Sequence, residues 1–292
     1  MVNDVTIRVV PADPSFLFRT PPRLGKRVFR LGLSASYGLD EAGAREALAS
    51  GVNYVFWTPF AKKLTLALRD AVKADRERLV IATGPILGYT GCAIRRRAER
   101  AMKVLGTDYL DVLQLYWLGT MSAWTHGTVD ELLKLKAEGK VRAIGVSIHD
   151  RERAGCLATD SVLDLLMIRY NAAHPGAERD VFRQLAPRGP AVVAYTATSW
   201  TKLLRAPRGW TGRVPTAGDC YRFCLTSPHV DVVLSAPGNA TRMRQNLRAL
   251  EQGPLSDAEM GFLREFGRAV HGRSVHERDV YGRDVRGRDV HG

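Results

Sequence analysis

Eight short apolar runs, separated by amphipathic stretches, constrain the fold of this chain more than any other feature of its sequence. The runs span residues 28–33, 53–56, 79–82, 109–115, 143–146, 163–168, 191–194 and 230–234. Each is almost continuously apolar, which is typical of parallel strands covered by helices on one face and by a filled interior on the other. The alternation of strand and helix therefore predicts an α/β fold, a closed (β/α)8 barrel of the TIM type.

Amphipathic stretches between the runs supply the expected helices. They span residues 40–49, 64–73, 93–105, 128–138, 177–185, 219–226 and 241–250. The first begins at Asp40, a residue type that caps helix N-termini. A further helix is expected over residues 257–270, packed outside the barrel, with Ser256 or Asp257 as its cap.

The chain is expected to contain one folded domain with an extension at each end. A Pro-rich leader covers residues 1–27, and the barrel covers residues 28–270. In the tail, residues 271–292, the pentapeptide Arg-Asp-Val-x-Gly occurs three times, at 278–282, 283–287 and 288–292. Adjacent opposite charges, one small apolar residue and a glycine in every five residues cannot form a core, so the tail is predicted to be disordered.

The charge balance points to an anionic partner. Lys and Arg number 43 against 30 Asp and Glu, a formal net charge of +13. The basic residues are spread over many expected helices and no nucleic-acid-binding motif accompanies them, so a phosphorylated small molecule is favoured over nucleic acid.

The sequence has no features of a membrane-spanning, secreted or zinc-binding protein. No apolar run approaches the roughly 20 residues needed to cross a bilayer, and the first residues do not resemble a signal peptide. We therefore expect a cytoplasmic protein without a membrane partner. The four cysteines have no zinc-site spacing, so no metal site is expected.

Six motifs in register resemble the aldo-keto reductases. Their order along the chain is Arg-Leu-Gly-Leu at 30–33, Gly-Val-Asn-Tyr at 51–54, Tyr-Leu-Asp-Val-Leu-Gln at 109–114, Gly-Lys-Val-Arg-Ala-Ile-Gly-Val-Ser at 139–147, Tyr-Asn at 170–171 and Ser-Ala-Pro-Gly-Asn-Ala-Thr-Arg-Met-Arg-Gln-Asn-Leu at 235–247. The resemblance covers about residues 28–266. It implies a barrel that holds NADPH across the carboxyl ends of its strands. It also implies a catalytic tetrad of Asp, Tyr, Lys and His, in which a Tyr of tuned pKa protonates the substrate carbonyl.

Carried over position by position, the resemblance places other residues at all four tetrad positions. These are Phe56 (or Trp57) for the Asp, Ala61 (or Lys62) for the Tyr, Gly84 for the Lys and Tyr116 for the His. Tyr116 should point into the barrel mouth, where it could replace the missing proton donor. Alternatively, it is a buried aromatic residue whose hydroxyl is hydrogen-bonded.

The same resemblance assigns cofactor-binding residues and makes NADP(H) the expected cofactor. Ser147 and Tyr195 match residues that hold the nicotinamide, although Ile148 and Met167 replace an Asn and a Gln there. At the other end, Arg242 matches the residue that binds the adenosine phosphate, and Gln245 and Asn246 match the pair that binds the adenine.

Phe56, Trp57, Trp117 and Arg169 are expected to line the substrate pocket. Arg169 shares strand parity with Met167 and should point inward at the rim, where either a barrel carboxylate or an anionic ligand would satisfy it. His149, two residues after Ser147, should lie near the cofactor pocket, although a loop histidine is a weak sign of ligand chemistry.

Three functions are compatible with these residues. The first is an NADP(H)-binding oxidoreductase that reduces a carbonyl or related group of a small substrate, either neutral or anionic, with Tyr116 or solvent as proton source. The second is a catalytically inactive relative that senses the cofactor or binds another protein. The third is a barrel enzyme of non-redox chemistry, such as elimination or cyclisation.

Overall fold

Eight parallel strands close into a barrel, as the alternating pattern predicted. The computed structural model describes residues 14–34 and 38–281. In chain order the barrel strands are β3 (Leu31–Ser34), β4 (Tyr54–Phe56), β5 (Val80–Thr83), β6 (Leu110–Leu115), β7 (Val141–Ile148), β8 (Leu165–Arg169), β9 (Ala191–Tyr195) and β10 (Val232–Ser235). Each strand pairs with its neighbour in sequence, and β10 pairs with β3 to close the ring. The chain is therefore a (β/α)8 barrel.

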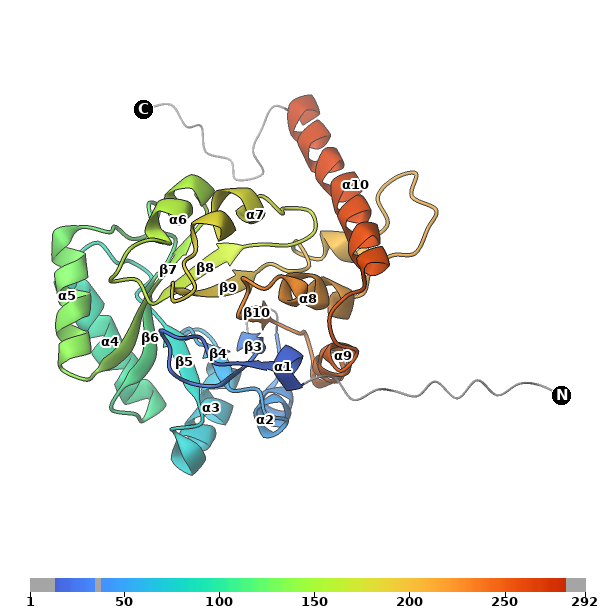
Figure 1. The fold of residues 1–292 in the computed structure, drawn as a ribbon. Coiled ribbons are helices and arrows are strands. Elements are labelled where there is room, and N and C mark those ends of the chain that lie inside the picture. Colours follow the sequence, from blue (N-terminus) through green and yellow to red (C-terminus); the bar gives the residue numbers. More distant parts are fainter. Residues whose placement is uncertain (1–13, 35–37, 282–292) are drawn as a thin grey trace.

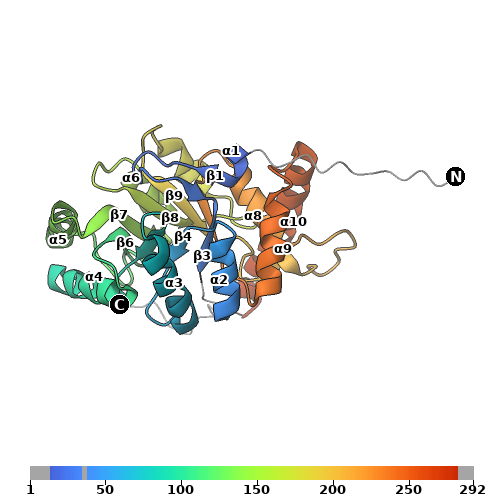
Figure 2. The same cartoon turned by 90° about the horizontal axis from the view of Figure 1, so that it is seen from below.

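Helices surround the barrel and follow its strands in turn (Figure 2). They are α2 (Glu41–Ala49), α3 (Lys62–Asp75), α4 (Gly91–Leu105), α5 (His126–Ala137), α6 (Arg151–Leu157), α7 (Ala177–Asp180), α8 (Ala217–Thr226) and α9 (Ala240–Leu250). The sequence pattern did not predict α6, a short helix that begins where Asp150 accepts a hydrogen bond from the backbone of Arg153. The helix expected over 177–185 is divided into α7 and a 3-10 turn, η1 (Phe182–Gln184), and a second 3-10 turn, η2 (Lys202–Leu204), precedes α8.

The first apolar run, residues 28–33, is divided between two sheets. Its first part forms β2 (Val28–Phe29), which pairs antiparallel with β1 (Phe18–Arg19) just after the short helix α1 (Pro14–Leu17). Only the second part continues as the barrel strand β3. Arg30 lies between the two, and its buried guanidinium donates to the carbonyl oxygens of Leu225 and Val230. The prediction of a single strand over residues 28–33 is therefore wrong, because the chain bends at Arg30 as it leaves one sheet and enters the other.

The final helix, α10 (Asp257–Tyr281), packs on the outside of the barrel and extends beyond it (Figure 1). Ser256 caps it, because the Ser256 hydroxyl accepts from the backbone of Glu259 while the Glu259 carboxylate accepts from that of Ser256. The helix continues eleven residues past Val270, so the tail predicted to be disordered from residue 271 is helical as far as Tyr281. Its last part, residues 282–292, lies outside the described residues.

Neither α10 nor any other helix in the described part of the chain has an apolar stretch long enough to cross a membrane.

Two apolar layers form the core, and strand alternation assigns side chains to one or the other. Side chains such as Tyr54 and Met167 fill the barrel interior. Their sequence neighbours, Val55 and Ile168, point outward and pack beneath the helices. The pleat of each strand therefore decides which residues at its carboxyl end can reach the barrel mouth.

Candidate active site

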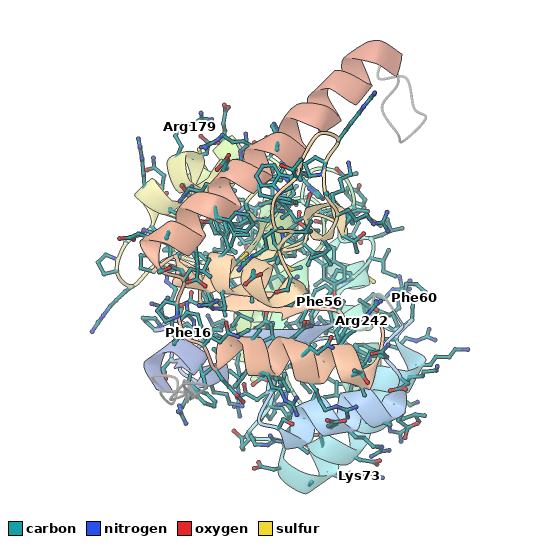
Figure 3. All side chains as sticks on the ribbon, turned by 90° about the vertical axis from the view of Figure 1, so that its right-hand side faces the viewer. Phe16, Phe56, Phe60, Lys73, Arg179 and Arg242 are labelled. Atoms are coloured by element: carbon teal, nitrogen blue, oxygen red, sulfur yellow. The ribbon has the colours of Figure 1, made fainter. Side chains whose placement is uncertain are left out.

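A cavity of about 1090 Å³ opens at the carboxyl ends of the strands. It extends from the end of β4, where Phe56 lies, past the ends of β6, β7 and β9 to the first turns of α9. Figure 3 shows Phe56, Phe60 and Arg242 gathered at this end of the molecule, with Phe16 at the opposite end. In barrels of this kind the strand carboxyl ends are where ligands bind, and the volume is that of a large ligand pocket.

Most residues that the sequence assigned to a site meet in this one cavity. Its lining includes Phe56, Tyr116, Trp117, Ser147, Tyr195, Arg242, Gln245 and Asn246. These side chains come from four different strand ends, those of β4, β6, β7 and β9, and from α9, and the closed barrel brings them together.

Trp57, in contrast, does not belong to the pocket. Its side chain is buried in the layer between the barrel and the helices, and its indole Nε1 donates to the Thr65 hydroxyl on α3 at 2.8 Å. Because successive side chains of a strand alternate, Phe56 faces the cavity and Trp57 must face outward. The expectation that both line the pocket is therefore wrong for Trp57.

Arg169 lies at the rim but is not among the residues that line the cavity. Its guanidinium carbon is 5.9 Å from the centre of the Trp200 ring, which does line the cavity. The inward parity of β8 thus brings Met167 into the pocket, whereas Arg169, at the last position of the strand, contacts the loop after β9 instead.

Tyr116 stands directly after β6, with its ring against Phe56 at 5.4 Å. Its hydroxyl donates to the carbonyl oxygen of Trp57 at 3.4 Å. Burial raises the pKa of the phenol well above its ordinary value, and hydrogen bonds with Thr83 and Gly84 offset this only in part. Tyr116 therefore stays protonated and is a reluctant acid.

Gly84, which follows β5, approaches the end of β6 too closely to be replaced by a residue with a side chain. A Cβ atom at this position would lie closer than 3 Å to the carbonyl oxygen of Gln114 and 3.2 Å from the Tyr116 ring. A lysine at the end of β5 would require the two strand ends to separate.

Polar contacts at the β6–β7 edge preorganise the centre of the cavity. The Ser147 hydroxyl oxygen accepts from the backbone N–H of Trp117 at 3.0 Å. Trp117 adopts a positive φ of 42°, an unusual conformation for a bulky residue that places its indole at the mouth. Ile148 points away into the outer layer, so Ser147 alone of this pair faces the pocket.

His149 also lines the cavity, beside Tyr195 and Trp117. The Tyr195 hydroxyl lies 3.0 Å from the imidazole Nδ1 and 3.4 Å from Nε2, and the two rings meet edge to face at 88°. The Trp117 ring centre is 6.0 Å from the imidazole. In the sequence, the only indication that this histidine lies in the pocket was its position two residues after Ser147, on the same side of the strand.

At the α9 end of the cavity, a buried hydrogen-bond chain holds Asn246 in place. Asn246 Nδ2 donates to the Ser235 hydroxyl at 3.1 Å, and the Ser235 hydroxyl donates to Tyr221 Oη at 3.1 Å. Burial raises the pKa of Tyr221 to about 12, although the bond with Ser235 opposes the shift. The side chains of Gln245 and Arg242 are exposed at the edge of the same cavity.

Sequence reasoning did not identify Arg205, which also lines the cavity. Of the described lining residues, Arg205 and Arg242 carry permanent charge, and none is a carboxylate. The cavity is thus electropositive where it meets α9 and the loop after β9. The described residues also contain no group of three His, Cys, Asp or Glu side chains that could hold a metal ion.

The fold and its cavity define the class of protein, a (β/α)8 barrel with a ligand-sized cavity at the carboxyl ends of its strands, and comparison with known proteins identifies the family. Residues 61–206, half of the chain, match the family model described as Aldo/keto reductase family. The chain belongs to this family of oxidoreductases, whose members typically use nicotinamide cofactors.

Curated relatives and solved structures agree with this assignment. The NADH-specific methylglyoxal reductase of Escherichia coli (strain K12) is 24% identical over 282 residues, which cover 77% of this chain and 86% of that protein. Aldo-keto reductase YhdN of Bacillus subtilis (strain 168) is 26% identical over 177 residues, 54% of this chain and 53% of that protein. The holo structure of aldo-keto reductase AKR11C1 from Bacillus halodurans superposes with a TM-score of 0.71 at 22% identity, and covers 86% of this chain and 96% of that one. The structural likeness shows the fold.

Proposed function

We propose that this protein is an NADP(H)-dependent oxidoreductase that reduces a carbonyl group of a small molecule in the cavity described above. The observation that carries the proposal is that one continuous cavity contains both sets of cofactor residues, Ser147 and Tyr195 at its centre and Arg242 and Asn246 at its α9 end. Membership of a family that uses nicotinamide cofactors supports it.

The residues present fit a dinucleotide. At the centre of the cavity, Tyr195 offers a ring face for the nicotinamide, and the Ser147 hydroxyl can still donate a hydrogen bond to its amide, because its oxygen already accepts from Trp117. At the other end, Asn246 is fixed by Ser235 and presents an amide for the adenine. The bound cofactor would supply hydride to the substrate.

Arg242 supports the choice of NADP(H) over NAD(H). It forms no salt bridge with any residue that the structure describes, whereas Arg244, two residues further along α9 and not part of the cavity lining, pairs with Glu46 at 2.6 Å. An exposed guanidinium at the start of a helix suits the additional phosphate of NADP(H). The Escherichia coli relative is named as NADH-specific, so this choice has to be tested directly.

The substrate end of the cavity is apolar. Phe56, Phe60, Ile86, Trp117 and Met121 line it, on the side of β4 to β6. An anionic ligand was one of the two partners expected for Arg169, which does not line the cavity. We therefore propose a small apolar or aromatic carbonyl compound as substrate, and no nucleic acid or membrane partner.

A second candidate function is cofactor binding without turnover. It is favoured by the close contact of Gly84 with the end of β6, which excludes the lysine that the family resemblance would place there. It is also favoured by Phe56, an apolar residue at the position of the family's Asp. Carbonyl reduction here would rely on alignment of the two reactants and on a proton donor outside the usual set.

The test is a calorimetric titration with NADPH and NADH of the wild-type protein and of two variants, followed by a screen of carbonyl compounds. We expect Arg242→Ala to weaken NADPH binding by about tenfold or more, since a charge-assisted contact contributes roughly 1.5–3 kcal/mol, and to leave NADH binding unchanged. Arg248→Ala, an exposed arginine on the same helix that does not line the cavity, is the matched control.

Each outcome separates the candidates. Equal affinity of Arg242→Ala and wild type for NADPH would contradict the phosphate assignment. Tight binding without oxidation of NADPH by any carbonyl compound would favour the non-catalytic function, and no binding at millimolar cofactor would reject both.

A further inference from the structure

We propose that His149, held in place by Tyr195, donates the proton to the carbonyl oxygen of the substrate. The inference rests on the proposed oxidoreductase function and specifies the residue that completes it. The observation behind it is a pair of titratable side chains that meet in the cavity wall. His149 directly follows β7 and Tyr195 ends β9, and these two strands are separated by β8.

The position of His149 follows from the barrel geometry. Along β7, Ser147 faces the cavity and Ile148 is buried in the outer layer. His149 comes next and faces the cavity again, one residue beyond the end of the strand. Across β8, the Tyr195 ring reaches back so that its hydroxyl lies 3.0 Å from the imidazole Nδ1. The imidazole is therefore anchored on one side by Tyr195 and on another by the Trp117 ring.

The chemistry of the reduction favours an imidazole over the available phenol. An effective proton donor has a pKa near the working pH, and an unperturbed histidine, with a pKa of about 6.5, meets this condition. Tyr116 is buried, has no lysine beside it, and its pKa is raised well above the ordinary value. Loss of its proton to a substrate would leave a phenolate in an apolar wall, which is costly.

The step balances with groups already named. The carbonyl carbon takes a hydride from the reduced cofactor, and its oxygen takes the proton of the His149 imidazolium as the C=O π electrons move onto oxygen. The products are the alcohol, the oxidised cofactor and a neutral imidazole, which regains a proton from solvent at the open mouth of the cavity. Tyr195 does not react: its hydroxyl accepts a hydrogen bond from the imidazolium and fixes the direction of the ring.

Charged and titratable groups face His149 from its own strand end, from β8 and from the rest of the cavity wall. On its own strand end the neighbour is Asp150, whose carboxylate accepts from the backbone of Arg153 and caps α6. On β8, the strand between β7 and β9, the last residue is the cationic Arg169. The titratable and charged groups of the described cavity wall are Tyr116, Tyr195, Tyr221, Arg205 and Arg242.

The first experiment follows the imidazole itself and needs no turnover. In ¹⁵N-histidine NMR, we expect the His149 signal, assigned by its loss in His149→Gln, to titrate between pH 5 and 8 and to shift when NADPH binds. In Tyr195→Phe its pKa should fall, because the acceptor of the imidazolium hydrogen bond is removed. A His149 signal that does not titrate in this range, or that is unaffected by Tyr195→Phe, overturns the proposal.

The second experiment measures the pH dependence of kcat. Reduction requires the protonated imidazole, so the wild-type rate should fall as pH rises through the pKa of His149. His149→Gln should lower kcat by about 100-fold or more, since general acid catalysis typically contributes 10²–10⁴-fold. It should also abolish this fall of the rate with rising pH (the alkaline limb of the profile), with NADPH affinity retained. Tyr195→Phe should move the limb to lower pH. His126→Gln, an exposed histidine with 94% of its side chain accessible, should keep the wild-type profile.

The outcomes distinguish this proposal from the one on which it rests. A wild-type protein that binds NADPH but reduces no carbonyl compound contradicts the proposed function, and the proton donor with it. A protein that reduces its substrate equally well and with the same pH limb in His149→Gln contradicts the histidine assignment alone. Loss of the limb in Tyr116→Phe, with the limb preserved in His149→Gln, assigns the proton to Tyr116 instead.

Discussion

At the scale of single residues, adjacent positions in the cavity wall have side chains that point in opposite directions and make different contacts. Phe56 and Trp57 are adjacent, yet one faces the ligand and the other bonds to Thr65 beneath a helix. Gly84 lies against the end of β6, so this position has no room for a side chain beside Tyr116. As a result, the wall of the barrel mouth around Phe56 and Tyr116 is mainly apolar. The polar side chains that line the cavity lie instead at the ends of β7 and β9 and on α9.

Asn246 provides a prediction at this scale, because it is buried and bonded to the Ser235 hydroxyl, which itself bonds to Tyr221. Asn246→Ala leaves the buried Ser235 hydroxyl with one partner fewer, so we expect the free energy of unfolding to fall by about 1–2 kcal/mol. Urea denaturation measures the change. Gln245→Ala removes an exposed neighbour on the same helix and should stay within about 0.5 kcal/mol of wild type. Equal stability of both variants would show that the buried chain contributes nothing.

At the scale of elements, α10 is attached to the barrel by a close backbone contact and an ion pair. A Cβ atom at Gly267 would lie closer than 3 Å to the carbonyl group of Ala172, so the helix approaches the loop after β8 where it has no side chain. One turn away, Arg264 pairs with Glu178 at 2.8 Å, and Glu178 also accepts from the Tyr170 hydroxyl. Contact with the barrel, beyond the amphipathic pattern of the helix, thus determines where α10 docks.

The close contact of α10 can be tested with a pair of glycines in one helix. Gly267→Ala should destabilise the protein by about 2–3 kcal/mol, because the helix must move away from Ala172 to admit the methyl group. Gly261→Ala meets no atom within 4 Å and should stabilise it by about 0.5–1 kcal/mol through helix propensity. Chemical denaturation of both variants gives the comparison. Two changes of the same sign would mean that α10 does not pack on the barrel at Gly267.

At the scale of the whole molecule, the excess of positive charge affects both ligand binding and stability. The formal charge of +13 favours an anionic ligand, and Arg205 and Arg242 bring part of that charge into the cavity. The same excess disfavours any further positive charge inside the fold. His174 illustrates this, because burial first, and then the positive charges of Arg169 and His271, lower its pKa to about 4.

Stability should therefore fall when the solution becomes acidic enough to protonate this histidine in the unfolded chain. The folded pKa of about 4 lies below the unfolded value of about 6.5, so the unfolded state takes up the proton first. The contribution is present in full above pH 6.5 and is lost as pH falls toward 4, by about 2 kcal/mol after allowance for partial exposure.

Urea denaturation at pH 7, 5.5 and 4.5 measures this dependence. His174→Gln should lose less stability over this interval than wild type does, and the exposed His126→Gln should behave like wild type. Parallel losses in wild type and His174→Gln would show that other groups control the acid sensitivity.

The sequence by itself determined the barrel and much of the candidate site. Continuous apolar runs can be buried on both faces only in a parallel sheet covered by helices, and eight of them close into a ring. Motif order and strand parity then placed Ser147, Tyr195 and Asn246 at the same end, and the structure brings them into one cavity.

Only the tertiary structure decided which of these side chains meet. His149 and Tyr195 lie 46 residues apart and become partners across an intervening strand. Trp57 and Arg169 were expected in the pocket, but their final contacts are with α3 and with the loop after β9. The division of the first apolar run at Arg30 and the docking of α10 at Gly267 likewise depend on contacts with distant segments. A sequence pattern specifies which residues are buried, because burial follows from local polarity, but it does not specify against what, because that depends on atoms far away in the chain.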